Sequence, residues 1–518
     1  MGLVRGVGRL LGVRAVRVGA GGDEGGTSRV PDGVDALVVG GGVAGISAAV
    51  VLAERGVRVT VLEARPTLGG RLASWSETLA DGTEQFVDHG FHAFFRQYYN
   101  WRSILRRIDP ALDLLRPVAG YPVLSADWPS EEFARLPTTP PLSLLALIAR
   151  SPSLRLRDLR TMDGNAALPL LAYHPVRTHA ELDRTTAKEL LDSLRLPDRA
   201  RAMLFEVFAH SFFNHEHNMS AAELVANFHF YLLGNPEGLG FDAPDRDYDS
   251  AIWRPLAAYL RQRGGLVRVG EPVTRIAPDD ERGGWRVSGA DGAQYRARFL
   301  VLAVDPPALR TLLATAPEVA ARAPRLASQA AAIEPGPPYA VARYWLAGDV
   351  APDRAVFSGV SRQPTLDSVT LYHRLEAGAR RWAGETGGSV VELHAYACPP
   401  DLAADELAER MRAELVGLWP EVGRLPVVEL RSRVERQAPS FRPGGHSSRP
   451  TVVTDADGLF LAGDGIRAGD GTRADSPSAL MERSAVTGIL AANQILRRHG
   501  TATEPIWSVR PRGLLARA

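Results

Sequence analysis

Apolar and polar residues follow one another near the start of the chain in blocks that predict a parallel α/β unit. The apolar run Asp35–Val39 predicts a short buried strand, and Ile46–Arg55 predicts a helix. A second apolar run, Val57–Leu62, predicts the next strand and ends in an acid, Glu63. A strand, helix and strand of these lengths fit a βαβ unit, whose two strands are parallel and buried on both faces.

The same kind of pattern returns much later in the chain. Leu266–Ile276 and Trp285–Val304 predict strands separated by glycine-rich turns, and Gly458–Asp464 is an apolar strand that ends in Gly-Asp. A helix is predicted over Ser478–Leu496. Strands of one sheet are therefore expected from distant parts of the chain, with long insertions between them.

Glycines mark the turn between the first strand and the first helix. Gly40, Gly42 and Gly45 have the spacing GxGxxG, and Glu63 follows about 20 residues later. Such glycines let backbone N–H groups approach a pyrophosphate at the positive end of a helix, and the acid can accept hydrogen bonds from ribose hydroxyls. The pattern predicts a dinucleotide site.

Composition excludes several other classes of function. The 518 residues carry 60 Lys or Arg and 59 Asp or Glu, a net charge of +1, so no global field favours nucleic acid, and none is expected as a partner. The single cysteine, Cys398, rules out an intrachain disulfide and a CxxC redox pair, which fits a reducing, cytoplasmic compartment. A chain of this length predicts two or three domains.

Three separated motifs resemble the FAD-dependent amine oxidase and carotene desaturase superfamily. The first is the GxGxxG turn, and the second is ARPTLGGRLAS, which follows Glu63. The third is GLFLAGD (458–464), with a helix containing Met481 after Pro477. The resemblance implies an α/β fold, in which a Rossmann-type FAD-binding domain carries an inserted, discontinuous α+β substrate domain, as in amine oxidase and GDI-like flavoproteins. It places the FAD-binding domain at 33–87, 250–305 and 450–500, and the substrate domain at 88–249 and 306–449. Residues 1–32 are expected to be a flexible or interfacial leader, and 501–518 a tail.

The resemblance also implies noncovalent FAD and the residues that bind it. They are Gly40, Gly42, Val43, Ala44, Gly45, Glu63, Ala64, Arg65, Gly69, Gly70, Arg71, Gly90, Val273, Ala303, Gly463, Asp464 and Met481. Two departures from the family pattern concern the same edge of the flavin: Arg483 stands where many desaturases have glycine, and the loop 466–476 is longer.

Three further stretches are similar to carotenoid ring aromatases, the isorenieratene synthase family. They are DHGFHAFFRQYYN (88–100), residues 128–153 and residues 464–483. The resemblance implies a carotenoid substrate, whose β-ionone ring is desaturated with migration of a methyl group to give an aromatic φ-ring. Quinone or oxygen is the expected electron acceptor, because we find no second complete dinucleotide fingerprint for NAD(P).

Such a reaction needs a base to remove a proton, and titratable side chains near the aromatic stretches are the candidates. We predict His92, Glu206 or His210, with Asp88 and His89 as further candidates. His210 also lies in HSFFNHEHN with His215 and His217, but without a catalytic-zinc spacing such as HExxH, so no metal is expected. Phe205, Phe208, Phe212, Phe213, Phe228, Phe230 and Tyr231 are expected mainly in the core, with some lining an apolar tunnel.

Two segments suggest peripheral contact with the inner face of the cell membrane. Residues 1–22 carry four arginines and no acid, and their apolar residues share one helical face. Leu142–Ile148, followed by Arg150, Arg155 and Arg157, is too short to span a bilayer. It fits either a shallow membrane contact or a buried helix.

Three alternatives remain at this point. An acyclic carotene desaturase of the phytoene or ζ-carotene type would share cofactor and substrate class without methyl migration. A GDI-like isoprenoid-binding protein would share the architecture without catalysis. An amine oxidase commonly has a lysine near the flavin in the later half of the chain, whereas the only lysine here is Lys188.

Overall fold

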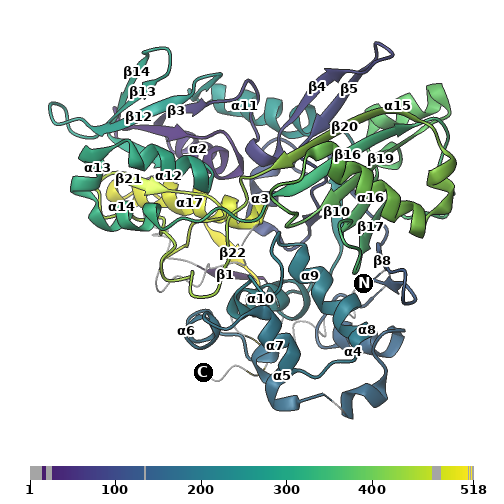
Figure 1. The fold of residues 1–518 in the computed structure, drawn as a ribbon. Coiled ribbons are helices and arrows are strands. Elements are labelled where there is room, and N and C mark those ends of the chain that lie inside the picture. The colour runs from purple at the N-terminus through teal and green to yellow at the C-terminus, as the bar shows by residue number, and fades with distance from the viewer. Residues whose placement is uncertain are drawn as a thin grey trace.

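The computed structural model describes residues 15–18, 26–133, 136–160, 162–469, 480–510, 513 and 515 (Figure 1). A five-stranded sheet, parallel at every pairing, forms the core of one lobe. Its strands lie in the order β11 (Leu266–Val269), β3 (Arg58–Glu63), β2 (Asp35–Val39), β15 (Phe299–Leu302) and β21 (Leu459–Leu461). The strands predicted from distant parts of the sequence therefore meet in one sheet.

Two helices pack closely beside this sheet, α2 (Val43–Glu54) and α17 (Met481–Arg498). α2 begins three residues before the predicted start, because Gly42 already serves as its N-cap. Glycine lets the backbones approach: a Cβ at Gly488 would lie 2.1 Å from the carbonyl oxygen of Ala44, and one at Gly45 1.9 Å from that of Gly40. Gly45 thus serves the close packing of the helix on its strand.

A seven-stranded sheet forms the core of the second upper lobe. Its order is β20 (Val427–Glu435), β16 (Tyr339–Leu346), β19 (Ser389–Ala395), β18 (Ser368–Leu371), β17 (Phe357–Val360), β8 (Pro122–Leu124) and β9 (Glu131–Glu132). β17 and β8 pair through Gly359 and Val123, so the two predicted insertions share one sheet. The domain boundaries themselves stay a prediction.

Shorter elements complete the fold. The other strands are β4 (Ser74–Thr78) with β5 (Glu84–Asp88), β6 (Phe94–Phe95) and β7 (Leu115–Pro117) with β10 (Phe241–Pro244), and the antiparallel set β12 (Val273–Pro278), β13 (Trp285–Gly289) and β14 (Gln294–Ala297). The helices of the lower lobe in Figure 1 are α4 (Leu142–Arg150), α5 (Gly164–Leu171), α6 (Arg177–Leu182), α7 (Ala187–Ser193), α8 (Asp198–Arg201), α9 (Val207–His210) and α10 (Ala221–Phe228). Elsewhere lie α3 (Tyr99–Leu105), α11 (Arg254–Arg261), α12 (Pro306–Ala314), α13 (Pro317–Arg322), α14 (Pro324–Ala331), α15 (Ala377–Thr386) and α16 (Ala404–Leu418).

The two ends of the described chain pair with each other. β1 (Val16–Val18) is antiparallel to β22 (Ile506–Ser508), and Thr27 forms a bridge with Thr501. The prediction of a flexible or interfacial leader does not include this strand, because its partner lies nearly 500 residues away and leaves no local signal. The rest of the predicted apolar face, residues 3–11, lies outside the described residues.

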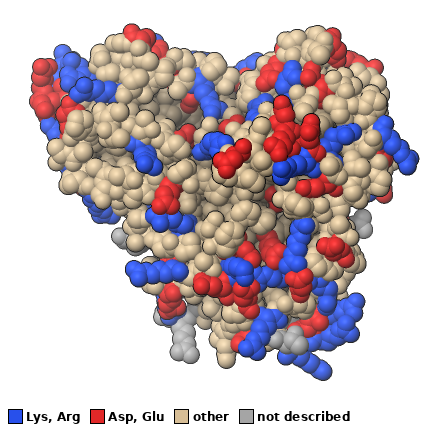
Figure 2. Space-filling model, in the orientation of Figure 1, with Lys and Arg blue, Asp and Glu red and all other residues tan. Residues whose placement is uncertain are grey.

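The outer surface carries charges of both signs. On the face drawn in Figure 2, basic and acidic side chains lie interspersed over all three lobes. In the described part of the chain, no helix has both the length and the apolar character that a membrane span requires.

Candidate functional site

A cavity of about 510 Å³ lies where the parallel sheet meets the larger sheet. Four parallel strands present their carboxyl ends to it through Gly40, Glu63, Ala303 and Gly463. In open α/β sheets, ligands bind at this edge. One end of the cavity is formed by these glycine-rich loops and the other by aromatic side chains.

The loops after β2 and β3 are bonded into one surface. The Glu63 carboxylate accepts hydrogen bonds from the backbone N–H of Gly41 at 2.6 Å and of Arg65 at 2.8 Å. The N–H of Gly69 donates to the carbonyl of Gly41 at 2.9 Å. A single carboxylate thus fixes the first glycine motif against the second.

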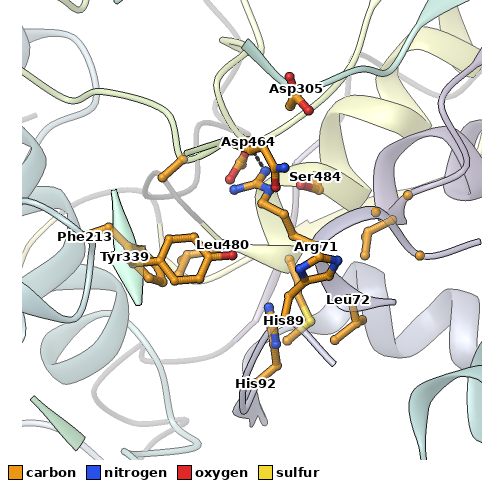
Figure 3. Close-up of a pocket in the computed structure, with 18 of the residues that line it drawn as sticks. Arg71, Leu72, His89, His92, Phe213, Asp305, Tyr339, Asp464, Leu480 and Ser484 are labelled. Atoms are coloured by element: carbon orange, nitrogen blue, oxygen red, sulfur yellow. Dashed lines mark hydrogen bonds and ion pairs between the residues drawn. The ribbon is translucent and has the colours of Figure 1, made fainter. Parts of the chain in front are cut away.

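An ion pair joins the second glycine motif to the third. The Arg71 guanidinium donates to Asp464 at 2.6 Å, and Figure 3 shows this contact in the cavity wall, with Tyr339 and Leu480 nearby. Burial alone would lower the pKa of Arg71, but the charge and the hydrogen bond of Asp464, together with the charges of Tyr339 and Asp305, outweigh burial and raise the pKa. Two segments almost 400 residues apart therefore meet at one charged contact.

Nearly all of the predicted cofactor residues line this cavity. The exceptions are Gly45, which packs beneath Gly40, and Gly90. Gly90 has φ +107°, and a Cβ there would lie 2.8 Å from Nε2 of His394. The structure thus explains both glycines by close packing, and their prediction as cofactor contacts is not supported.

The aromatic end contains residues that the sequence pattern identified and others that it missed. Of the predicted aromatic set, Phe208, Phe212, Phe213 and Tyr231 line the cavity, whereas Phe205 and Phe228 stack on each other at 5.7 Å. Phe91, Phe95 and Tyr98, from the aromatic stretch 88–100 that the sequence singled out, also line the cavity. The lining residues that sequence reasoning missed are Tyr121, Phe133, Phe241, Tyr339, Phe357 and Tyr396. Most of these are single aromatics in short strands or loops, where the pattern indicates only burial.

His92 and His210 line the cavity, but their surroundings differ. Nδ1 of His92 is 2.8 Å from the carbonyl oxygen of Gly90, and burial lowers the pKa of His92 to about 4. Nδ1 of His210 is 3.1 Å from Asp367. Burial opposes its charge, but the hydrogen bond and charge of Asp367 outweigh burial and raise the pKa of His210.

Glu206 does not line the cavity. Its carboxylate accepts hydrogen bonds from Arg201 at 2.8 Å and from Arg362 at 2.9 Å. Burial raises its pKa, but the two guanidinium groups outweigh burial and lower it. The prediction of Glu206 as the base is therefore corrected, because a partner 156 residues away, Arg362, turns this carboxylate into an ion-pair acceptor.

Asp88 and His89 belong to two buried polar clusters. Arg343 donates to Asp88 at 2.8 Å and to Glu392 at 2.6 Å, and all three side chains are buried. His89 lines the cavity, with Nδ1 2.6 Å from Glu435. Asp88 is thus the partner of a buried guanidinium, while His89 faces the cavity.

The side chains of His210, His215 and His217 are not among the groups of the described residues whose possible metal ligands converge. His215 contacts the carbonyl oxygen of Ala397 at 2.9 Å and stacks on His217. Another trio within the described residues, His179, Glu223 and His446, brings its ligand atoms within 4.8 Å of one another. Arg449 donates to Glu223, and this positive charge disfavours a cation there.

The only lysine and the only cysteine lie away from the cavity. Lys188 is half exposed on α7 and pairs with Asp192 at 2.7 Å. Cys398 is buried, donates to the carbonyl of Pro338 at 3.3 Å, and belongs to the core of the larger sheet. Burial raises the pKa of its thiol to about 11. Neither side chain is among the cavity residues.

Comparison with known proteins places these features in a family. Residues 43–496 match the model of the flavin containing amine oxidoreductases. The chain is 42% identical over 472 residues to the carotenoid phi-ring synthase of Streptomyces griseus, covering 91% of this chain and 89% of that protein. It is 28% identical over 601 aligned positions to the carotenoid phi-ring synthase of Chlorobaculum tepidum, covering 93% and 91%. The solved structure of cyclohexylamine oxidase from Brevibacterium oxydans superposes with a TM-score of 0.64 at 15% identity, covering 90% of this chain and 99% of that one.

The buried cluster around Arg343 yields a stability prediction. Replacement by Arg343→Met leaves Asp88 and Glu392 as uncompensated buried charges, and should lower the free energy of unfolding by about 3–5 kcal/mol. Arg410→Met is the matched control, because the Arg410–Glu406 pair is half exposed and should change stability by about 0.5 kcal/mol or less. Thermal and urea unfolding measure both, and equal effects would contradict a structural role for the cluster.

Proposed function

The chain belongs to the flavin-containing amine oxidoreductase family, and from this we propose that it is an FAD-dependent carotenoid oxidoreductase that converts the β-ionone ring of a carotene into an aromatic φ-ring. The observation that carries the proposal is the single cavity, which runs from the glycine-rich loops to an aromatic chamber. A dinucleotide cofactor and an apolar ring can therefore meet in one enclosed space. The proposed ring chemistry is supported by two relatives, both carotenoid phi-ring synthases, which align over about nine tenths of this chain.

The cavity residues fit FAD as a noncovalent cofactor. α2 begins at Gly42 without a side-chain cap, so its first N–H groups can receive a pyrophosphate. Gly69 and Gly70, with φ of +118° and +57°, keep the second loop close to this site. Noncovalent binding is supported by the position of Cys398 outside the cavity. FAD, when bound, accepts hydride from the substrate.

We propose that the aromatic end of the cavity, called the aromatic chamber from here on, binds the ring and protects it during the methyl shift. Forming an aromatic ring removes four hydrogens from it and moves one methyl group of a geminal pair to the neighbouring carbon. The positive charge that precedes the shift must be protected from water. The faces of Phe91, Tyr121, Phe241 and Phe357 pack around one another at the cavity wall and can stabilise such a charge by about 0.5–2 kcal/mol each.

Amine oxidation fits the site less well, although structural neighbours with this fold include an amine oxidase. The position of Lys188 on the surface leaves the cavity without a lysine. The chamber is aromatic rather than acidic where the substrate would lie. Membership of a flavin family likewise favours an enzyme over a GDI-like binding protein.

We further propose that the protein docks peripherally on the inner face of the cell membrane and that quinone or oxygen takes the electrons. Helix α4 exposes Leu142 and Leu145 by 42% and 58%, while Leu147 is buried. A second cavity of about 240 Å³ reaches Leu144 on this helix and shares Tyr121 and Phe241 with the main cavity. A substrate dissolved in lipid would enter most directly by this route.

The choice of substrate is tested by supplying β-carotene and ζ-carotene separately to the flavin-loaded protein. We expect β-carotene to lose four hydrogens per aromatised ring with all of its carbons retained, and ζ-carotene to remain unchanged. Chromatography with mass spectrometry measures both. Consumption of ζ-carotene beside unchanged β-carotene would instead identify an acyclic desaturase.

Glu63 is expected to set the affinity for FAD. Glu63→Gln removes the charge that holds Gly41 and Arg65 and that faces the ribose site, so FAD should bind about 10- to 100-fold more weakly, since hydrogen bonds to a charged group contribute about 1.5–3 kcal/mol. Flavin fluorescence during titration of the apoprotein gives the Kd. Glu281→Gln, in the exposed turn between β12 and β13, is the control, and equal Kd values for the two variants would refute the assignment.

Membrane docking through α4 is tested with vesicles. The double substitution of Leu142 and Leu145 by Ser should reduce cosedimentation with vesicles that contain anionic lipid, because it removes two exposed apolar side chains from the proposed contact. The same change at Val427 and Val428, which are exposed by 43% and 45% on β20, is the control. Similar losses from both pairs would exclude a specific role for α4.

A further inference from the structure

One polar wall of the cavity has no part in the proposal so far. Glu392, His394 and Tyr396 alternate along β19 and the residue positions just after it, so their side chains share one face of the strand. His394 and Tyr396 line the cavity, and Glu392 lies behind them, fully buried. Polar side chains thus occupy positions in the middle of a buried sheet, where apolar side chains are usual.

The three side chains form a hydrogen-bonded chain. Nε2 of His394 is 2.8 Å from Glu392, and Nδ1 is 3.3 Å from the hydroxyl of Tyr396. The Tyr396 hydroxyl is also 3.1 Å from that of Ser368, which lines the cavity too. The backbone N–H of Phe91 also points at Nε2, at 3.4 Å, but the contact with Glu392 is much shorter. Because ionised Glu392 can only accept, we assign the donor to Nε2 of His394, which leaves Nδ1 to accept from Tyr396.

The buried charges beside His394 sum to a negative value. Asp88 and Glu392 carry two negative charges, and Arg343 carries one positive charge, so the buried cluster sums to −1. Burial would raise the pKa of Glu392, but Arg343 and His394 outweigh it and lower this pKa to about 2. A proton on His394 brings the cluster to zero charge.

Of the other titratable groups around this wall, His210 also has a carboxylate partner, Asp367, whereas His92 and Arg71 have different surroundings. Nδ1 of His92 contacts only the carbonyl oxygen of Gly90, which offers a dipole but no negative charge. Asp367 accepts from the backbone N–H of Tyr396 at 2.6 Å and pairs with His210. Arg71 lies at the flavin end with Asp464.

We propose that Tyr396 and His394 receive the proton that the ring loses when it becomes aromatic, with Glu392 as the residue that positions His394. This inference rests on the proposed function. The C–H bond of the ring breaks, and its electron pair completes the ring double bond. The proton binds the oxygen of Tyr396 while the phenolic proton moves to Nδ1 of His394. Each of the two oxidations of a ring thus sends one hydride to the flavin and one proton to this pair, which accounts for the four hydrogens. Tyr396 ends each oxidation neutral and His394 ends it as imidazolium, so His394 must release its proton to water before the second oxidation.

Gly90 supplies independent support for a fixed imidazole. Its φ of +107° and the absence of a side chain let the backbone pass where a Cβ would lie 2.8 Å from Nε2 of His394. The ring is therefore held between this backbone and Glu392. Such a close approach is expected where a side chain must keep one orientation.

The experiment compares His394→Ala and Tyr396→Phe with His92→Gln in the flavin-loaded protein, with β-carotene as the probe. Formation of the aromatic product should fall about 100-fold in His394→Ala and substantially in Tyr396→Phe, which removes only one oxygen atom. His92→Gln, which changes the other imidazole beside this wall, should reduce product formation less than His394→Ala does. Added imidazole should restore product in His394→Ala, increasingly as pH rises.

The controls separate the outcomes. His499→Ala, at the end of α17, should match the wild type with and without imidazole. A wild-type rate in His394→Ala would overturn the inference, as would a loss of product in His92→Gln as large as the loss in His394→Ala. Wild-type protein that makes no aromatic ring would instead overturn the proposed function, and this inference with it. Flavin content and thermal midpoint, measured on every variant, identify those that fail to fold. If His394→Ala fails to fold, the rate of Tyr396→Phe tests the inference in its place.

Discussion

The buried guanidinium of Arg343 holds the aromatic half of the site in place. It lies between Asp88, at the start of the first insertion, and Glu392, on a strand of the second. A charge taken out of water must be paired, so this contact fixes the segment 88–92 against β16 and β19. That segment places His89 and His92 in the cavity wall, and β19 places His394 there. The chemistry of the chamber therefore depends on an ion pair that contacts no substrate.

A second constraint acts at the flavin end. Parallel strands bring their carboxyl ends to one edge of a sheet, so loops from the beginning, middle and end of the chain converge there. Glu63 binds the first glycine loop to the second, and the Arg71–Asp464 pair binds the second to the third. Charged contacts therefore hold both halves of the site, and at the cofactor end they act on loops that the parallel sheet has already brought together. The two halves share one cavity because the two sheets adjoin along it.

The cofactor half could be predicted from sequence because its signals are local. Strand, glycine turn, helix and acid follow one another within about thirty residues, and each residue type has one physical role. The substrate half gave weaker signals. Glu206 is a plausible base until Arg362 is seen beside it, and Gly90 resembles a cofactor contact until His394 is seen against it. His394 and Tyr396 carry a detectable sign, the alternation of polar residues in a strand that is otherwise apolar, but strand pairing decides which face meets the cavity, and the sequence does not reveal pairing.

The central claim is that one enclosed cavity brings FAD and the ring of a carotene together. The most direct measurement is an experimental structure of the flavin-loaded protein with bound β-carotene. The account predicts the flavin along the glycine loops and one β-ionone ring between the flavin and the wall formed by Tyr396 and His394, with the polyene extending past Tyr121 and Phe241. A ring bound outside this cavity, or separated from the flavin by ordered side chains, would contradict it.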